Sequence, residues 1–295
     1  MNEKMLEMMK DKRGFIAALD QSGGSSSKTL KAYGINEDEY STEEEMFDLI
    51  HEMRKRVFTS KSFTSDHIIG AILFEKTMNS KIGDEYTSEY LWNEKGILSF
   101  LKVDKGLQDE ANGVKLMKEI PNLAEQCQVA VGHNVFGTKM RSVIYEPNRE
   151  GIKAIVKQQF EFAKVICDNG LVPIIEPEVD IHAPEKELCE SMLKEEIKEV
   201  LNTWDMNDKI MFKFTIPTVE NLYLDLYDYE CVVRIVALSG GYSVDEAVEK
   251  LAKNHRMIAS FSRALLQDLR VDQSQEEFDK ILGDVIVKIY NASID

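Results

Sequence analysis

The 295-residue sequence has no long hydrophobic run. Its longest apolar stretch, residues 68–74, is far shorter than the roughly 20 residues that a membrane-spanning helix needs. The first residues also lack the basic region and apolar core of a secretory signal. Glycine (16) and proline (6) are too scarce for a collagen-like or low-complexity chain, and 43% hydrophobic residues are too many for a disordered one. We therefore expect a soluble globular protein.

Paired cysteines and an excess of basic charge are absent as well. The four cysteines (Cys127, Cys167, Cys189 and Cys231) have no CxxC spacing, which predicts free thiols in a reducing compartment, the cytoplasm. Lys and Arg number 36 against 52 Asp and Glu, a net charge of −16. That charge opposes binding to nucleic acid or to an anionic membrane. A small phosphorylated ligand stays compatible with it where basic residues converge.

Eight short apolar runs recur along the chain, at residues 14–20, 68–74, 99–104, 137–143, 171–178, 211–216, 231–240 and 256–263. They are rich in β-branched or aromatic residues and bounded by Gly, Pro or charge, which is typical of buried strands. Residues 150–170, 186–204 and 243–254 show the apolar period of helices. Strands alternating with helices eight times predict an α/β fold, the (β/α)8 TIM barrel. Because no linker interrupts the chain, we expect a single domain over residues 1–295.

Seven of these runs carry a charged or polar residue at or near their C-terminal end: Asp20, Lys102, Lys139, Glu176, Lys213, Ser239 and Arg263. Four of them follow one another at intervals of 37 residues, which indicates successive βα units of similar length. Active sites of (β/α)8 barrels lie at this end of the strands. A charge within an apolar strand is unfavourable unless it is paired or functional. The pattern therefore predicts an active site.

These residue types limit the chemistry of such a site. Lys213 stands between two phenylalanines, and burial together with a second lysine nearby lowers the pKa of an ammonium group. A neutral amine adds to a ketone to form a Schiff base. Glu176 suits the proton transfers of that reaction, and Asp20 suits the acceptance of a hydroxyl proton while a carbon–carbon bond breaks. Anionic groups would be held by Lys102, Arg141, Arg263 and the Ser239-Gly240-Gly241 loop.

Each feature also has a structural interpretation. Glu176 and Glu178 share one strand face and would suit a salt-bridged strand end. Lys139 and Arg141 share a face too and would suit ordinary surface charge, and the Gly23-Gly24 pair fits any turn. No pair of histidines has metal-ligand spacing, and no nucleotide-binding motif occurs. We expect no metal and no cofactor.

Six segments, taken in order, resemble the class I fructose-1,6-bisphosphate aldolases. They are LKVDKG (101–106), TKMR (138–141), VPIIEPE (172–178), FKFT (212–215), LSGG (238–241) and FSRAL (261–265). The similarity begins at GFIAALDQSGGS and spans roughly residues 10–270. It implies a cytoplasmic, metal-independent lyase of glycolysis and gluconeogenesis. Such an enzyme cleaves fructose 1,6-bisphosphate reversibly into dihydroxyacetone phosphate and glyceraldehyde 3-phosphate through a lysine Schiff base.

The resemblance also implies a role for each matching residue. Lys213 would form the Schiff base, with Glu176 as its acid and base. Lys139 would assist carbinolamine conversion, Glu178 would support the lysines, and Asp20 would orient them and take part in cleavage. The phosphate of the ketone half would lie against Ser239, Gly240, Gly241 and Arg263. The aldehyde half and its phosphate would lie against Ser22, Ser25, Lys102 and Arg141.

The sequence departs from the family pattern at three places. Animal members end in a tyrosine that helps to protonate the enamine, whereas Tyr290 is expected within the last helix here. Position 29 is Thr where some relatives have Arg, and position 262 is Ser where Gly is frequent. These changes suit a bacterial-type branch. The resemblance therefore does not identify the group that protonates the enamine.

Three other functions stay open on the sequence alone. The substrate could be an epimer such as tagatose 1,6-bisphosphate, because the two sugars differ at one hydroxyl. A non-catalytic barrel that binds sugar phosphates or acts in adhesion would have lost its lysine or carboxylates, and these are present. A metal-dependent lyase would be inhibited by chelators. The sequence does not define the oligomeric state.

Overall fold

A computed structural model describes residues 2–22 and 24–294, without the side chains of residues 24 and 25. Eight parallel strands follow one another in the order β1-β2-β5-β7-β8-β9-β10-β11. Their bounds are Phe15–Leu19, Ile68–Leu73, Leu98–Lys102, Gly137–Ile144, Val172–Val179, Ile210–Thr215, Val232–Leu238 and Met257–Ala259. The last strand meets the first where the Ala18 N–H donates to the Phe261 carbonyl at 3.3 Å. The predicted (β/α)8 barrel is confirmed, and each predicted run overlaps one of its strands.

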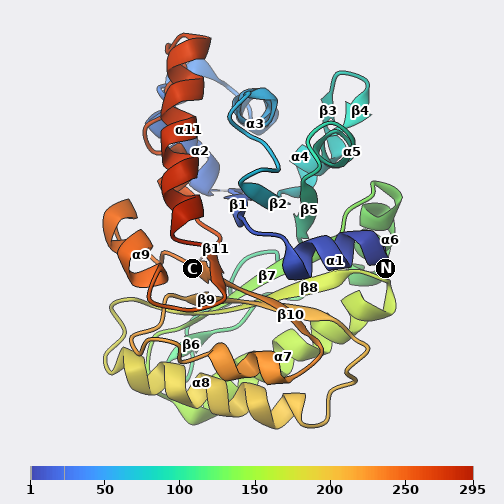
Figure 1. Cartoon of the computed structure of the whole chain (residues 1–295), viewed down its shortest axis with the longest axis vertical. Helices are drawn as coiled ribbons and strands as arrows, with labels where there is room; N and C mark the ends of the chain where they lie inside the picture. The colour runs from blue at the N-terminus through green and yellow to red at the C-terminus, as the bar shows by residue number, and fades with distance from the viewer. Residues whose placement is uncertain (1, 23, 295) are drawn as a thin grey trace.

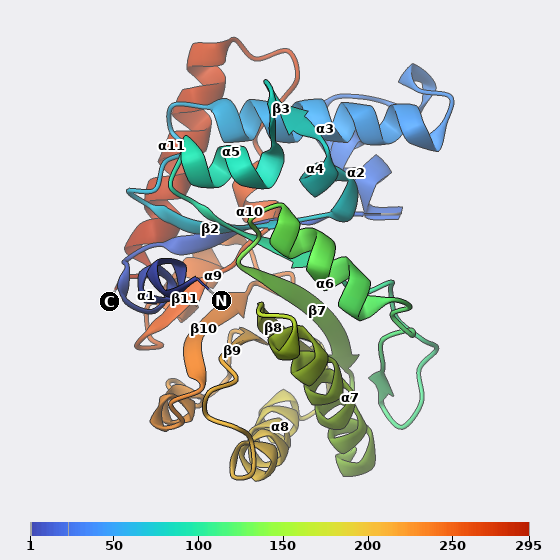
Figure 2. The ribbon, with the colours of Figure 1, turned by 90° about the vertical axis from the view of Figure 1, so that its right-hand side faces the viewer.

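Eleven helices of the described residues pack around the strands or over the ends of the barrel (Figure 1, Figure 2). They are α1 (Glu3–Asp11), α2 (Gly24–Tyr33), α3 (Glu43–Thr59), α4 (Glu75–Asn79), α5 (Thr87–Asn93), α6 (Leu123–Gly132), α7 (Arg149–Asp168), α8 (Lys186–Leu201), α9 (Val244–Leu251), α10 (Arg263–Leu266) and α11 (Gln275–Asn291). Two 3-10 turns, η1 (Glu37–Glu39) and η2 (Leu224–Asp228), lie in loops. The short strands β3 (Lys81–Ile82) and β4 (Glu85–Tyr86) form a hairpin, and β6 (Val114–Lys115) pairs antiparallel with β7.

The three predicted helices are present, and their ends follow from local chemistry. The side chain of Asn148 accepts the Gly151 N–H at the start of α7. Shortly after α7 ends, Gly170 has a φ of +81°, a conformation that glycine adopts without steric cost. At the start of α9, the hydroxyl of Ser243 accepts the Glu246 N–H.

Helix α1 closes the N-terminal end of the barrel. Met5 and Met9 on this helix are buried against barrel-interior side chains such as Ile69 and Leu98. Arg234 of β10 holds the C-terminal end of α1, because its guanidinium donates to the carbonyls of Met9, Lys10 and Lys12 at 2.9, 2.7 and 3.0 Å. With this end filled, a substrate can reach the interior from the C-terminal ends of the strands.

Successive side chains of each strand point alternately into the barrel and toward the helices, which gives the protein two apolar cores. Side chains such as Ile16 of β1 and Met211 of β9 fill the barrel interior. Their neighbours, such as Phe15 and Phe212, pack against the helices. Because successive strand residues point to opposite faces, Lys213 lies on the inward face that Met211 occupies. The inward faces are therefore apolar in the middle of the barrel and polar at its C-terminal end.

Candidate active site

The inward-facing polar residues at the C-terminal ends of the strands line one cavity of about 220 Å³. It is lined by Ala18, Asp20, Lys139, Arg141, Glu176, Glu178, Lys213, Leu238, Ser239, Gly240, Ser260, Ser262 and Arg263. The strand register explains part of this convergence. Arg141 of β7 is paired with Glu176 of β8, and Lys213 of β9 with Val236 of β10. These residues are brought together by the closed sheet, although some lie more than two hundred positions apart.

A buried cluster of two lysines and two carboxylates forms the floor of the cavity. Lys139 Nζ lies 2.9 Å from Glu176 Oε2 and 3.1 Å from Asp20 Oδ2. Lys213 Nζ lies 3.7 Å from the same Glu176 oxygen. The side chains of Lys139, Glu176 and Lys213 are each about 5% exposed or less, and that of Asp20 is 12% exposed. Both ammonium groups therefore share one carboxylate in a region with little water.

The electrostatics distinguish the two lysines. Burial works against the charged form of Lys139, but the carboxylates of Asp20 and Glu176 outweigh it and hold its pKa above the usual value. Burial also lowers the pKa of Lys213, where attraction from Glu176 opposes the shift and the charge of Lys139 adds to it. Lys139 is thus held as a cation, whereas Lys213 loses its proton more readily than an ordinary lysine. Imine chemistry requires such a difference in pKa, because the nucleophilic amine must be neutral while its electrostatic partner stays charged.

Asp20 is held in its ionised form. Burial alone would raise the pKa of this carboxyl group, but the ammonium groups of Lys139 and Lys213 overcome it and hold the pKa below its usual value. The group sits directly after β1, which ends at Leu19. A carboxylate accepts a proton only while ionised, and Asp20 is held in that form.

Two further ion pairs lie beside this cluster. Arg141 Nε lies 2.5 Å from Glu178 Oε2, and the two residues come from neighbouring strands. Burial opposes the charge of Arg141, but its hydrogen bond to Glu178 dominates and the pKa of the guanidinium is raised. Lys102 Nζ lies 3.0 Å from Asp104 Oδ1, on β5 and the loop that follows it. Lys102 is paired in register with Lys139.

The loop after β10 approaches the cavity with its backbone. Gly240 has a φ of +61° and Gly241 one of +123°, both in the region that favours glycine. A Cβ atom on Gly240 would lie 2.7 Å from the side chain of Ile181, so no larger residue fits there. A Cβ on Gly241 would lie 3.8 Å from Arg263 Nη2, which places the loop next to that guanidinium. Backbone N–H groups and an arginine side by side suit an anion such as phosphate.

Nine of the thirteen residues singled out from the sequence line the cavity: Asp20, Lys139, Arg141, Glu176, Glu178, Lys213, Ser239, Gly240 and Arg263. Gly241 stands directly beside it, and Ser22 and Lys102 are outside its lining. The side chain of Ser25 lies outside the described residues. For all thirteen residues, contact with the substrate stays a prediction.

Sequence reasoning missed Ser260 and noted Ser262 only as a departure from the family pattern, and both residues line the cavity. Ser260 is 1% exposed, and its hydroxyl is among the buried groups without a hydrogen-bond partner in the described part of the chain. The signal was the alternation Ser260, Ser262 at the end of the last apolar run. Both serines lie between the last strand residue, Ala259, and Arg263, the first residue of α10.

Tyr290 lies away from the cavity. Its ring packs edge-on against His67, with centroids 4.7 Å apart. His67 directly precedes β2, and its carbonyl accepts the N–H of Phe15, the first residue of β1. Tyr290 is therefore at the N-terminal end of the barrel strands, whereas the lysine cluster is at the C-terminal end.

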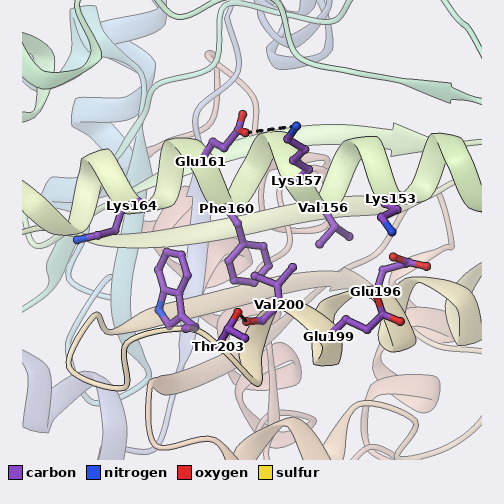
Figure 3. A pocket seen from close by; sticks show the side chains of 11 residues that line it. Lys153, Val156, Lys157, Phe160, Glu161, Lys164, Glu196, Glu199, Val200 and Thr203 are labelled. Carbon is purple, nitrogen blue, oxygen red and sulfur yellow. Dashed lines mark hydrogen bonds and ion pairs between the residues drawn. The ribbon is translucent and has the colours of Figure 1, made fainter.

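A larger cavity of about 510 Å³ lies elsewhere, between α7 and α8 (Figure 3). Its floor is apolar, with Val156, Phe160 and Trp204, and its rim carries lysines of α7 and glutamates of α8. Lys157 on this rim is paired with Glu161 at 3.9 Å. None of the residues singled out from the sequence lines it. The smaller cavity, with its buried lysines and carboxylates, is the candidate active site.

The barrel and its buried lysine–carboxylate cluster define an enzyme of the class that works at the C-terminal end of a (β/α)8 barrel. The model of the glycolytic family, fructose-bisphosphate aldolase class I, matches residues 1–215, which include Lys213. The chain belongs to this aldolase family and is thereby a lyase of glycolysis.

A solved structure shares the fold over nearly the whole chain. It is a fructose-bisphosphate aldolase from Plasmodium falciparum, crystallised with TRAP and a small-molecule inhibitor. The TM-score is 0.77 at 21% identity, and the match covers 99% of this chain and 93% of that one. No helix within residues 2–22 and 24–294 is both long and apolar enough to cross a membrane.

Proposed function

We propose that this protein cleaves fructose 1,6-bisphosphate reversibly into dihydroxyacetone phosphate and glyceraldehyde 3-phosphate through an imine on Lys213. One observation carries the proposal. The buried amine of Lys213, with its lowered pKa, lies 3.7 Å from a carboxylate that the cationic Lys139 holds at 2.9 Å. An amine that loses its proton readily, a carboxylate and a fixed positive charge in one cavity are what imine formation requires, and this supports the proposal.

The first half of the reaction forms the imine. The neutral amine of Lys213 adds to C2 of the open-chain ketose, and a proton passes from the nitrogen to the former carbonyl oxygen to give a carbinolamine. Glu176, carrying the proton that the Lys213 ammonium gave up, delivers it to the carbinolamine hydroxyl, which leaves as water while the C–N bond becomes a protonated imine. Lys139 stabilises the negative charge that this step leaves on Glu176.

The second half breaks the carbon–carbon bond. Asp20 accepts the proton of the C4 hydroxyl, the C3–C4 electron pair moves toward the imine nitrogen, and glyceraldehyde 3-phosphate is released. The remaining enamine takes a proton from solvent at C3, and Asp20 returns its proton to solvent. Water then hydrolyses the imine to free dihydroxyacetone phosphate and regenerate Lys213. The imine lowers the energy of this step because its positive nitrogen accepts the electron pair.

The phosphates would lie on opposite sides of the lysine cluster. Ser239, Gly240, Gly241 and Arg263 would bind the phosphate on the ketone half, joined by the hydroxyl groups of Ser260 and Ser262. Arg141, Ser22, Ser25 and Lys102 would form the site for the aldehyde half. Glu178 would orient Arg141 and support the lysines, since it lies 2.5 Å from the Arg141 guanidinium.

We propose that the reaction needs no metal, that residues 1–295 act as one domain, and that the protein works in the cytoplasm. Glycolytic sugar phosphates are cytoplasmic metabolites, and all four cysteines are free thiols, which fits a reducing compartment. In the described part of the chain, no group of three or more His, Cys, Asp or Glu residues is placed to hold a metal ion.

Reductive trapping tests the proposal. The protein is incubated with dihydroxyacetone phosphate and a chelator, reduced with borohydride, digested and mapped by mass spectrometry. We expect a three-carbon phosphate adduct on Lys213, with unmodified Lys139 as an internal control in the same cluster. An adduct on Lys139 alone would reassign the nucleophile, and the absence of any adduct on folded protein would refute the imine mechanism. Cleavage rates with fructose and tagatose 1,6-bisphosphates then identify the preferred sugar.

A further inference from the structure

Arg54 is a buried charge that the proposed reaction does not use. It lies on α3 and is 1% exposed. Among the ion pairs of the described residues, none involves Arg54. Burial lowers the pKa of its guanidinium to about 10, and the nearby charge of Asp20 acts in the opposite direction. A buried ion without a paired partner is unfavourable by several kcal/mol unless other contacts compensate.

The donors of Arg54 converge on the loop that carries Asp20. Its Nη2 donates to the main-chain carbonyl of Gln21 at 2.6 Å and to the Gln21 side-chain Oε1 at 3.3 Å. Its Nη1 donates to the hydroxyl of Thr77 on α4 at 2.6 Å. The guanidinium therefore ties α3 and α4 to the residue directly after Asp20.

Gln21 extends this contact across the barrel. Its side-chain Nε2 donates to the hydroxyl of Ser262, the residue directly before Arg263. Here β1 meets β11, the last and shortest of the eight barrel strands. A 3.3 Å backbone hydrogen bond runs here from the Ala18 N–H to the carbonyl of Phe261, two residues after β11. The Arg54–Gln21–Ser262 bridge thus crosses the seam at which the barrel closes.

We propose that Arg54 is a positioning residue that holds Asp20 and Arg263 in one fixed geometry by way of the Arg54–Gln21–Ser262 bridge. The inference rests on the aldolase reaction proposed above, in which Asp20 accepts a proton and Arg263 binds phosphate. These two residues come from opposite ends of the chain and each is one position away from a member of the bridge. Arg54 itself does not line the cavity, so it acts through Gln21.

A guanidinium is needed because its geometry is a planar fork. One end reaches Thr77 and the other reaches Gln21, and both bonds are made without rotation of the group. A lysine at this position would keep the charge but offer one nitrogen for both acceptors. Methionine would fill the space and leave the Gln21 carbonyl without its donor.

A double-mutant cycle tests the bridge. We expect Arg54→Met to lower kcat/KM at least about tenfold, since displacements of about 1 Å in an active site reduce rates up to about a hundredfold. Arg54→Lys is expected to recover part of this loss. Ser262→Ala breaks the same bridge. The fold-decrease in kcat/KM of the double variant should therefore be smaller than the product of the fold-decreases of the two single variants.

Arg56→Met is the matched control. Arg56 lies on the same helix and also donates to main-chain carbonyls, those of Arg270, Val271 and Gln273, away from the cavity. We expect this variant to lower stability while kcat/KM stays within about twofold, and its effect to combine multiplicatively with that of Ser262→Ala. If Arg54→Met behaves as Arg56→Met does, the residue is merely structural and the proposal is wrong.

Two additional measurements keep the test decisive. If Arg54→Met does not fold, Gln21→Ala replaces it in the cycle, and independent effects of Gln21→Ala and Ser262→Ala on kcat/KM would overturn the proposal. Wild-type trapping on Lys213 is measured first, so that an inactive wild type identifies a failure of the proposed function. The free energies of unfolding in urea, measured for the same single and double variants, then test the bridge without an activity assay. Strictly additive changes in these free energies would also overturn the proposal.

Discussion

Lys139 and Lys213 approach one carboxylate oxygen, Glu176 Oε2, from two different strands, at 2.9 and 3.7 Å. The pKa of Lys139 is raised by the two carboxylates that it contacts, whereas that of Lys213 is lowered by burial and by the charge of Lys139. Two identical side chains in one cavity thus have different protonation properties. This difference supports the proposal that Lys213 is the nucleophile.

Lys213→Ala should abolish turnover, with at least a thousandfold expected loss of kcat, because no other neutral amine is available to form the imine. Folding should be largely retained, since Glu176 keeps its closer ion pair with Lys139. The measurement is steady-state cleavage of fructose 1,6-bisphosphate, with circular dichroism as the check on folding. Activity near that of the wild type would reject the assignment.

The pH dependence of trapping should report on Lys213. Its folded pKa is lowered below the ordinary 10.5, so the rate of reductive trapping should rise with pH and level off below that value. Lys139→Met removes the like charge that favours loss of the Lys213 proton, and it should therefore move the rise to higher pH. A shift to lower pH in this variant would contradict the electrostatic account.

Asp20→Asn should destabilise the fold at neutral pH by about 3 kcal/mol, since it breaks a buried ion pair with Lys139. The folded pKa of Asp20 is lowered, so its stabilisation is present above the unfolded pKa of about 3.9 and is lost as the pH falls toward the folded value. Urea unfolding at several pH values should show the two proteins converging below about pH 4. A constant difference over that range would show that the loss is not electrostatic.

Arg263→Ala should raise KM for fructose 1,6-bisphosphate and the dissociation constant of dihydroxyacetone phosphate by about tenfold each, because both carry the phosphate that this guanidinium would bind. Arg270→Ala is a control on the same segment, since Arg270 donates to the carbonyls of Gln267 and Leu269. Unchanged values for both ligands in Arg263→Ala would remove it from the phosphate site.

Tyr290→Phe should leave kcat within about twofold of the wild type, because this tyrosine packs on His67 at the opposite end of the strands. Removal of residues 291–295 should lower stability instead. Ser293 is 7% exposed and its hydroxyl accepts the N–H of Ala259, the last residue of β11. A large fall of kcat in Tyr290→Phe, at unchanged stability, would show that this residue takes part in proton transfer.

Much of the site could be predicted from strand patterns. Lys213 between two phenylalanines, and the interval of 37 residues from Lys102 to Lys213, indicated inward-facing charge at the C-terminal ends of successive strands. Lys139, Glu176 and Lys213 do line one cavity. The same pattern predicted Lys102 as a site residue too. Its ammonium group, however, lies 3.0 Å from Asp104, and Lys102 does not line the cavity. Strand position predicts which face a side chain takes, but not which neighbour it pairs with.

The sequence by itself determined the barrel and the kinds of residue at its C-terminal end, because apolar alternation and strand spacing are local properties of the chain. Only the tertiary structure decided that Lys213 would lose its proton more readily than Lys139, since that depends on the distances of both to Glu176 and Asp20. It also decided that Arg54, which looks in sequence like any polar residue of a helix, would be buried against Gln21. Closure of the sheet brings residues from both ends of the chain together, and no local pattern encodes that contact.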